Sequence, residues 1–221
     1  MSVAENIAAI REKMSAAALA AGRDPGEILL VGASKMNDAQ ACRDAIAGGI
    51  DALGENRVQE LTQKLSENAY AGAPIHFIGH LQTNKVKQVV GKVDLIQSID
   101  RMKLLECVQQ EAARQGIVQD ILLEINIGEE ESKSGFRLGD ILPLVAQMSN
   151  YPNIRVRGLM AIPPICENPG DNHKFFAEIS RLAVDITAKK YDNVCVDVLS
   201  MGMSGDCEDA IACGSTMVRL G

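Results

Sequence analysis

Residues 28–38, ILLVGASKMND, form an apolar run that ends on a lysine and leads directly into a helix-like pattern. The apolar residues read as a buried strand, and they pass through Gly-Ala-Ser to Lys35. Asn37 and Asp38 follow, and both residue types are common N-caps of helices. A strand that passes through a short loop into a helix is the repeating unit of parallel α/β folds, so this segment predicts such a fold.

The same alternation of apolar runs and amphipathic patterns repeats along the whole chain. The predicted strands cover residues 28–34, 51–55, 75–79, 94–98, 120–127, 154–162, 194–200 and 217–221. The clearest helical patterns cover residues 3–21, 39–49, 101–116 and 172–190. Eight strands separated by helices predict an α/β fold, a single (β/α)8 TIM barrel. An open doubly wound sheet is the alternative, but no GxGxxG motif follows the first strand to support it.

Length and composition predict one domain over residues 1–221 with a small-molecule role. A chain of 221 residues with 47% hydrophobic residues lies within the size range of one barrel. The net charge of -7 argues against a nucleic-acid partner, because phosphate backbones attract an excess of Lys and Arg. No apolar block has the length of a signal-peptide core or a membrane span, so we expect no membrane partner and a cytoplasmic location.

The cysteines and the surface helices indicate no metal site, no disulfide framework and no dimer interface. The six cysteines are scattered without a CxxC pair, and the chain has only three histidines. This spacing predicts neither a metal site nor a disulfide framework, but reduced thiols. The helices show no unusually apolar stripe, so we expect a monomer.

Polar or basic residues stand at most of the predicted strand ends, which is where TIM barrels carry their functional residues. Lys35 follows the first strand and Asn56 the second. Ser200 ends the seventh strand, and Arg219 and Gly221 lie on the eighth. This clustering exceeds what a plain scaffold needs, and it predicts a site at the barrel mouth.

Lys35 has two interpretations. Most lysines at strand ends simply extend along the surface until the ammonium group reaches water. A functional lysine in a barrel mouth would instead be partly desolvated, which favours the neutral amine that attacks a carbonyl group to form a Schiff base.

The segment SMGMSGD, residues 200–206, predicts a phosphate site near this lysine. Phosphate-binding barrels hold the anion on the loops after strands seven and eight, where backbone N–H groups are free to donate. Ser200 supplies a hydroxyl, Gly202 permits close approach, and Ser204 is a predicted helix N-cap. Gly221 ends the eighth strand. Tight turns would also explain the glycines, but a Schiff-base lysine facing a phosphate site describes a pyridoxal phosphate (PLP) site.

A set of short segments, spread in order over almost the whole chain, resembles the pyridoxal phosphate homeostasis protein family, the YggS/PROSC group. The segments are ASK (33–35), GENRVQE (54–60), HFIGHLQTNK (76–85), SID (98–100), ESKSGF (131–136), GLM (158–160), SMGMSGD (200–206) and AIACGSTMVRLG (210–221). Each is weak alone, but the set is specific. The resemblance implies a fold-type III PLP-binding barrel like the N-terminal domain of alanine racemase, without a second domain.

The resemblance also implies roles for single residues. Lys35 would hold PLP as an internal aldimine, and Asn56 would reach the cofactor ring, although its place before RVQE also fits a helix cap. Ser200 would donate its hydroxyl to the phosphate, and Gly221 its backbone N–H. Arg219 would face the pyridine nitrogen, the alternative being a surface or ion-pairing arginine.

The implied function is PLP (vitamin B6) homeostasis by storage or delivery of the cofactor, including delivery to PLP-dependent apo-enzymes, without strong catalysis. Arginine stays protonated and leaves the ring nitrogen neutral, so the cofactor would be a poor electron sink. The alternative, a PLP-dependent amino-acid racemase or related α-carbon enzyme, needs a second acid/base residue. Tyr70, Tyr151 and Tyr191 are all predicted on helices or loops away from the carboxyl ends of the strands. A Schiff-base aldolase without cofactor would not explain the segments.

We make three further predictions, about two loops and about the end of the chain. We interpret His80 and Gln82 as structural residues of the third loop, with His80 as an acid or base as the alternative. Lys133 is predicted to be a solvated loop lysine, with a secondary aldimine as the alternative. The family usually continues beyond the position of Gly221 through a short segment ending in Phe-Gly and a basic residue, so we expect weaker phosphate binding from the chain as printed.

Overall fold

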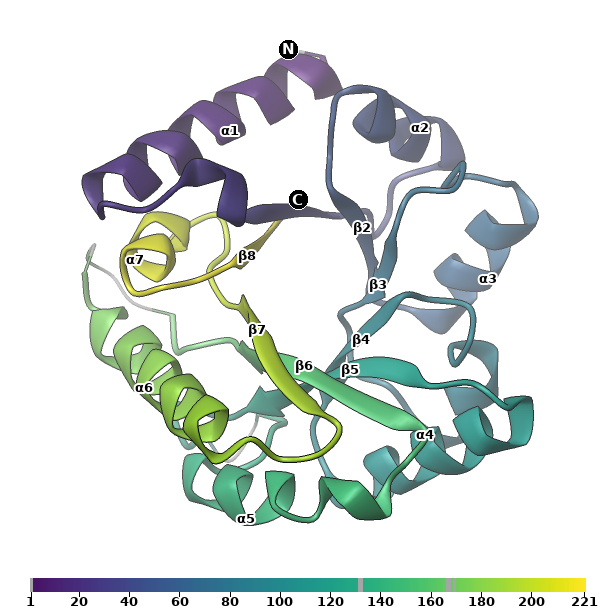
Figure 1. Cartoon of the computed structure of the whole chain (residues 1–221). Helices are drawn as coiled ribbons and strands as arrows, with labels where there is room; N and C mark the ends of the chain where they lie inside the picture. The colour runs from purple at the N-terminus through teal and green to yellow at the C-terminus, as the bar shows by residue number, and fades with distance from the viewer. Residues whose placement is uncertain (1, 131–132, 166–167, 169) are drawn as a thin grey trace.

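Each strand of the computed structural model pairs in parallel with the next strand along the chain, and the last pairs with the first. The model describes residues 2–130, 133–165, 168 and 170–221. Its strands are β1 (Leu29–Ala33), β2 (Ala52–Glu55), β3 (Ile75–Phe77), β4 (Leu95–Ile99), β5 (Gln119–Ile125), β6 (Ile154–Ala161), β7 (Val194–Ser200) and β8 (Met217–Leu220). Figure 1 shows this closed barrel with the helices around it. The predicted TIM barrel is therefore confirmed.

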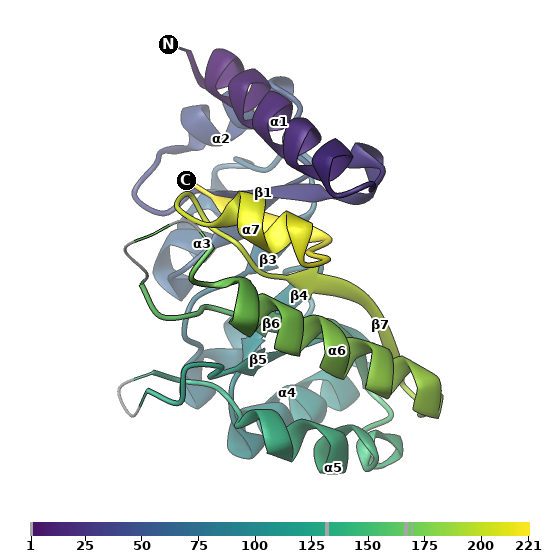
Figure 2. The same cartoon turned by 90° about the vertical axis from the view of Figure 1, so that its left-hand side faces the viewer.

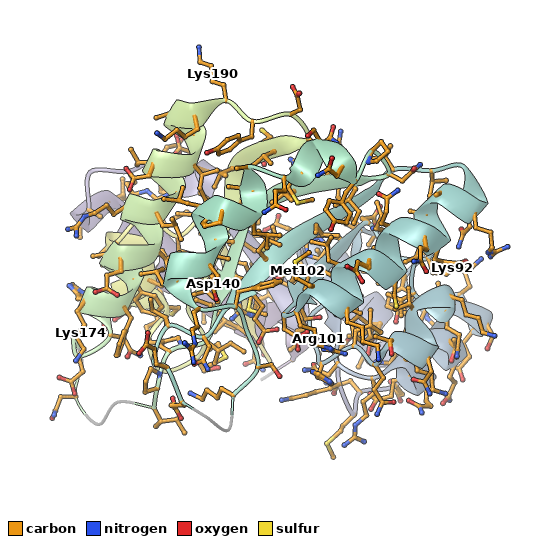
Figure 3. All side chains as sticks on the ribbon, turned by 90° about the horizontal axis from the view of Figure 1, so that it is seen from below. Lys92, Arg101, Met102, Asp140, Lys174 and Lys190 are labelled. Atoms are coloured by element: carbon orange, nitrogen blue, oxygen red, sulfur yellow. The ribbon has the colours of Figure 1, made fainter. Side chains whose placement is uncertain are left out.

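The helices surround the barrel and begin near the carboxyl ends of the strands. They are α1 (Val3–Ala20), α2 (Ala39–Ala47), α3 (Val58–Ser66), α4 (Met102–Gln115), α5 (Ile141–Val145), α6 (His173–Lys189) and α7 (Cys207–Ala212). Short 3-10 turns are η1 (Pro25–Glu27), η2 (Thr83–Gln88), η3 (Leu138–Asp140) and η4 (Met148–Asn150). In Figure 3, Lys174 at the start of α6 and Lys190 after its end lie on opposite sides of the molecule, so this helix spans the depth of the barrel.

Local sequence signals explain where several helices begin. Ser2 and Glu5 form a reciprocal capping box at the start of α1. Asp38 caps α2 by accepting a hydrogen bond from the Ala41 amide, as its residue type predicted. The prediction for Ser204 was wrong, because α7 begins only at Cys207 and Asp206 occupies the N-cap position.

The apolar core has an inner and an outer part, which follows from the alternation of side chains along each strand. A small cluster lies inside the barrel, and it consists of Val31, Ala52, Leu95, Leu122, Met160 and Met217. A much larger cluster lies between the barrel wall and the helices. A third cluster joins α1 to β1, β8 and α7. Figure 2 shows α1, β1 and α7 close together. The cluster inside the barrel occupies one part of the interior, and polar side chains occupy the part beside the mouth.

None of the helices in the described ranges is long and apolar enough to cross a membrane. Cys166 and the first two residues of the ESKSGF segment lie outside the described residues.

Candidate functional site at the barrel mouth

Lys35 lies in a tight turn directly after β1, and its side chain is exposed. The Asn37 amide donates to the Ser34 carbonyl oxygen at 3.1 Å, which closes the turn around Lys35 and Met36. Met36 has a φ of 62°, in the left-handed region that non-glycine residues rarely occupy. The turn brings Lys35 to the mouth as predicted, although in this structure the side chain is not desolvated.

A buried polar cluster supports this turn from outside the barrel wall. Glu55, at the end of β2, accepts hydrogen bonds on Oε1 from Ser34 Oγ at 2.5 Å, from Lys64 Nζ at 2.7 Å and from Tyr70 Oη at 3.0 Å. Burial, followed by the charge of Glu55, raises the pKa of Tyr70, so its hydroxyl remains a donor. The cluster joins β1, β2 and α3 behind the lysine turn.

A second polar network crosses the barrel interior beneath the mouth. Arg219 Nη1 donates to the Ser200 carbonyl oxygen at 2.8 Å and to Ser200 Oγ at 2.6 Å, and Nη2 donates to the Ala161 carbonyl oxygen at 3.1 Å. Ser200 Oγ donates to Gln97 Oε1 at 2.6 Å. Gln97 Nε2 lies 2.9 Å from His76 Nδ1, and an amide nitrogen can only donate, so Nδ1 is the acceptor. Four strands thus share one connected set of side chains.

Burial shifts the proton affinities of three groups in this interior. It lowers the pKa of His76 to about 4, so the imidazole is neutral at pH 7. It lowers the pKa of Arg219 to about 10, which leaves the guanidinium charged. Burial, with a further contribution from the charge of Asp100, raises the pKa of Glu124 on β5 to about 7. The interior therefore holds one fixed positive charge and one carboxyl group that titrates near neutrality.

Three buried side-chain oxygens near the strand ends have no hydrogen-bond partner in the described part of the chain. They are Glu55 Oε2, at the end of β2, Asn56 Oδ1, just after it, and Ser98 Oγ, on β4. Asn56 does not cap α3, because Arg57 occupies the N-cap position, so the predicted alternative role for Asn56 was wrong. Gly79 explains how Asn56 is held, since a Cβ built on Gly79 would lie 2.1 Å from the Asn56 carbonyl oxygen. Buried polar groups are normally paired, so Asn56 Oδ1 and Ser98 Oγ are candidate hydrogen-bond acceptors for a ligand at the mouth.

The loop after β7 lies beside the end of β8, as predicted for the phosphate site. Gly202 has a φ of 97°, and a Cβ there would lie 2.6 Å from the Ala210 Cβ atom. Gly221 also lies close to β1, because its Cβ would lie 2.9 Å from the Ala33 carbonyl oxygen. Both positions therefore require glycine for close backbone approach.

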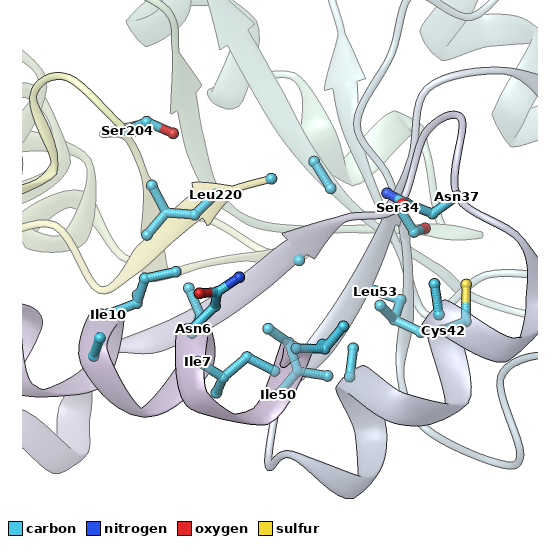
Figure 4. Close-up of a pocket in the computed structure, with 18 of the residues that line it drawn as sticks. Asn6, Ile7, Ile10, Ser34, Asn37, Cys42, Ile50, Leu53, Ser204 and Leu220 are labelled. Carbon is cyan, nitrogen blue, oxygen red and sulfur yellow. The ribbon is translucent and has the colours of Figure 1, made fainter. Parts of the chain in front are cut away.

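A cavity of about 520 Å³ opens beside these loops, between α1, α2, β1 and β8. Figure 4 shows its apolar floor, with Ile7 and Ile50 among the lining side chains. Its polar rim includes Ser34, Ser204 and Gly221. Ser204 is exposed there, so its hydroxyl is a donor at the mouth in place of the helix cap that the sequence predicted.

Ser200 is placed differently from its expected role. Its side chain is fully buried, and its hydroxyl is already engaged with Gln97 and Arg219. Arg219 is only 5% exposed and is bound to backbone and hydroxyl oxygens, which excludes the alternative of a surface arginine. Gln97 and Glu124 were not predicted as site residues from the sequence. Both are polar residues at inward positions of apolar strands, a signal that the period-two pattern contains.

The residues of the neighbouring loops are engaged in structural contacts. His80 Nδ1 lies 3.1 Å from Asp100 Oδ2, while its side chain remains 54% exposed. Gln82 occupies the N-cap position of η2. Lys133 Nζ donates to the Pro163 carbonyl oxygen at 3.2 Å and lies 2.6 Å from Glu130 Oε1, so it links two loops rather than extending freely into solvent.

Comparison with known proteins gives close matches over the full chain. The family model described as alanine racemase, N-terminal domain, matches residues 2–221. A pyridoxal phosphate homeostasis protein of Aquifex aeolicus is 41% identical over 221 residues, which cover 100% of this chain and 96% of the relative. One from Escherichia coli is 40% identical over 223 residues, covering 99% and 94%. A structure of PipY from Synechococcus elongatus with PLP bound is 30% identical, with a TM-score of 0.84 and coverage of 99% and 97%.

Proposed function

This chain belongs to the pyridoxal phosphate homeostasis protein family, as its short segments predicted, and we propose that it binds PLP at the barrel mouth and holds it for other enzymes. The same relatives include a solved protein with PLP bound, PipY, which supports the choice of cofactor. The proposal covers storage or delivery to PLP-dependent apo-enzymes, without strong catalysis by this chain.

The residues at the mouth fit PLP in their chemistry. An exposed lysine amine, a buried guanidinium and two glycines at positions of close backbone approach come from β1, β8 and the loops that follow β1 and β7. The register pairs Val31 with Arg219 and Gly32 with Leu220, so the strand that leads to Lys35 runs beside the strand that carries Arg219. The unpartnered Asn56 Oδ1 offers a hydrogen-bond site for the ring.

The observation that carries the proposal is the position of Lys35 at the end of β1, beside β8. PLP, when bound, supplies an aldehyde carbon that a lysine amine can attack. Arg219 would face the ring nitrogen and, because it stays charged, would give that nitrogen no proton. Gly221 and the loop after β7 would bind the phosphate through backbone N–H groups, joined by the exposed Ser204 hydroxyl.

Ser200 keeps a place in the site, but with a changed role. Since its hydroxyl donates to Gln97 and accepts from Arg219, we assign it to holding the guanidinium in place. A direct contact of this hydroxyl with phosphate would break one of these bonds in a fully buried position.

The tyrosines favour binding over racemisation. Two-sided proton transfer at an α-carbon needs an acid/base group on each face of the substrate. Tyr70 is buried against Glu55 on the outside of the wall. Tyr151 and Tyr191 precede β6 and β7, so they lie near the amino ends of these strands, away from the mouth.

We further propose that the protein works in the cytosol and as a monomer. All cysteines in the described part of the chain are free thiols, and Cys42 and Cys207 are buried. Thiols persist in this form in the reducing cytosol.

The test is the visible absorption spectrum of the purified protein with added PLP, beside the Lys35→Ala variant. We expect an absorption band of the lysine-bound cofactor in the wild type and none in the variant. Borohydride reduction followed by peptide mapping should then place the cofactor on Lys35. A band that survives in the variant, or an adduct on Lys133, would contradict the assignment of the lysine.

A further inference from the structure

The polar contacts behind Lys35 all come from one helix and one neighbouring strand end. Helix α3 carries Glu60 and Lys64, which lie four residues apart and hence on the same face. Glu60 Oε2 accepts a hydrogen bond from the Met36 amide at 2.9 Å. Lys64 Nζ donates to the Ser34 carbonyl oxygen at 2.6 Å. The two residues that flank Lys35 are therefore each fixed by a side chain of α3.

The Lys64 contact lies in a buried position, where removing a lysine from water costs free energy of desolvation. Lys64 is 4% exposed and Glu55 is fully buried, so both charges are removed from water. Buried ion pairs contribute little net stability, because desolvation offsets their attraction, and apolar replacements are often neutral. Stability therefore does not explain the buried pair. The best attested alternative is that such a pair fixes one conformation of its surroundings.

The only group outside the ion pair that Lys64 Nζ contacts in the described structure is the Ser34 carbonyl oxygen. Glu55 meanwhile accepts from the Ser34 hydroxyl. Both polar groups of Ser34 on this side are thus bound to one ion pair, and Ser34 precedes Lys35 directly. The ion pair and the Asn37 amide therefore fix the orientation of the Ser34–Lys35 peptide together, and with it the starting point of the Lys35 side chain.

We propose that Lys64 and Glu60 are positioning residues for the amine of Lys35, acting from outside the barrel wall on the turn that presents it. Lys35 capture of PLP joins the amine nitrogen to the aldehyde carbon and releases the aldehyde oxygen as water with both amine protons. This step requires the amine to meet the carbon at a defined distance and angle, and displacements of about 1 Å can cost about a hundredfold in rate. The inference rests on the proposed function.

The experiment uses two probes that differ only in the reacting group. PLP has an aldehyde and can join Lys35, whereas pyridoxine 5′-phosphate has an alcohol at that position and binds only through its ring and phosphate. A positioning role predicts that Lys64→Met slows formation of the visible band with PLP by about tenfold or more, while the Kd for pyridoxine 5′-phosphate stays within about twofold. Glu60→Ala should show the same split more weakly.

Two control variants separate positioning from general damage. Gln59→Ala changes an exposed residue of α3 that does not contact the lysine turn. Gln119→Leu removes a buried polar side chain at the amino end of β5, far from the mouth, and reports what loss of stability alone does. Neither should alter the rate with PLP. If Lys64→Met does not fold, Glu60→Ala carries the test alone, because Glu60 lies at the surface end of the contact.

Equal loss of affinity for both probes, or no change with either probe, overturns the positioning role. A wild type that binds neither probe overturns the proposed function and this inference together. A wild type that binds both, with variants that behave like it, overturns the inference alone.

Discussion

Arg219 holds both oxygen atoms of Ser200, the carbonyl oxygen at 2.8 Å and the hydroxyl oxygen at 2.6 Å, with the same guanidinium nitrogen. The contact ties β8 to β7, two neighbouring strands in which Ser200 pairs with Met217. A guanidinium that closes the barrel at this point has a structural role in addition to any contact with a cofactor.

Replacing Arg219 should therefore destabilise the protein even without cofactor. Arg219→Met leaves two buried carbonyl oxygens without their donor, and each such group costs about 1–3 kcal/mol. We expect the free energy of unfolding in urea to fall by about 2–5 kcal/mol. Arg114→Met, at an exposed arginine of α4, is the control and should change little. Equal effects of the two changes would contradict the assigned role.

Glu124 should make stability fall as the pH rises towards neutrality. Its pKa in the folded protein is raised to about 7 from an ordinary value of 4.5, so between these values the folded state binds more protons than the unfolded state. The contribution is fully present below pH 4.5 and is lost as the pH passes 7. At pH 8, Glu124→Gln should be more stable than the wild type by up to about 3 kcal/mol, with no such gain at pH 4. Urea unfolding of both proteins from pH 4 to 8 measures this, and parallel curves would refute it.

His76 should act in the opposite direction. Its pKa is lowered from 6.5 to about 4, so between these values the unfolded state binds more protons. This contribution to stability is fully present above pH 6.5 and is lost as the pH falls through the folded value. In His76→Asn, the side-chain oxygen can accept the Gln97 hydrogen bond without titrating. The variant should thus lose less stability than the wild type between pH 6.5 and 4, and thermal unfolding over this range is the check.

Gly202 should resist substitution, whereas Gly205 in the same loop should not. An alanine at position 202 would combine a φ of 97° with a Cβ only 2.6 Å from Ala210. We expect a loss of stability of at least about 1 kcal/mol and weaker binding of PLP, since the loop proposed to bind the phosphate would shift. A Cβ at Gly205 would meet nothing within 4 Å, so Gly205→Ala is a matched control. Similar affinities of both variants would argue against this loop as the phosphate site.

The binding function predicts very slow chemistry at an amino acid's α-carbon. The PLP-loaded protein, incubated with each amino acid in deuterated water, should show no α-deuterium exchange above that of free PLP. Rapid exchange, followed by mass spectrometry, would favour the racemase alternative and would require an acid/base pair that the three tyrosines do not supply.

Much of the architecture could be predicted because it depends on local patterns. Each strand was located within two residues of its observed bounds, since the apolar runs and their flanking loops repeat with the periods of strand and helix. Asp38 could be recognised as a cap for the same reason, because capping involves residues only a few positions apart.

Lys35, Arg219 and Gly221 could also be placed at one site, because the ends of parallel strands in a barrel meet at one mouth. The contacts inside the site could not be predicted, since they join residues far apart in the chain whose side-chain directions depend on the closed barrel. Ser200 turns inward to Gln97, which lies 103 residues away. Its hydroxyl is therefore not available to the proposed phosphate site. Lys64 reaches back 30 residues to Ser34 on the outer side of the barrel wall.

The sequence by itself thus determined the periodic elements and the strand that ends on Lys35, because apolar periodicity and capping act over a few residues. The tertiary structure alone decided which polar groups satisfy one another and which remain open to a ligand. The physical reason is that desolvation makes every buried donor and acceptor seek a partner, and the partners become neighbours only when the barrel closes.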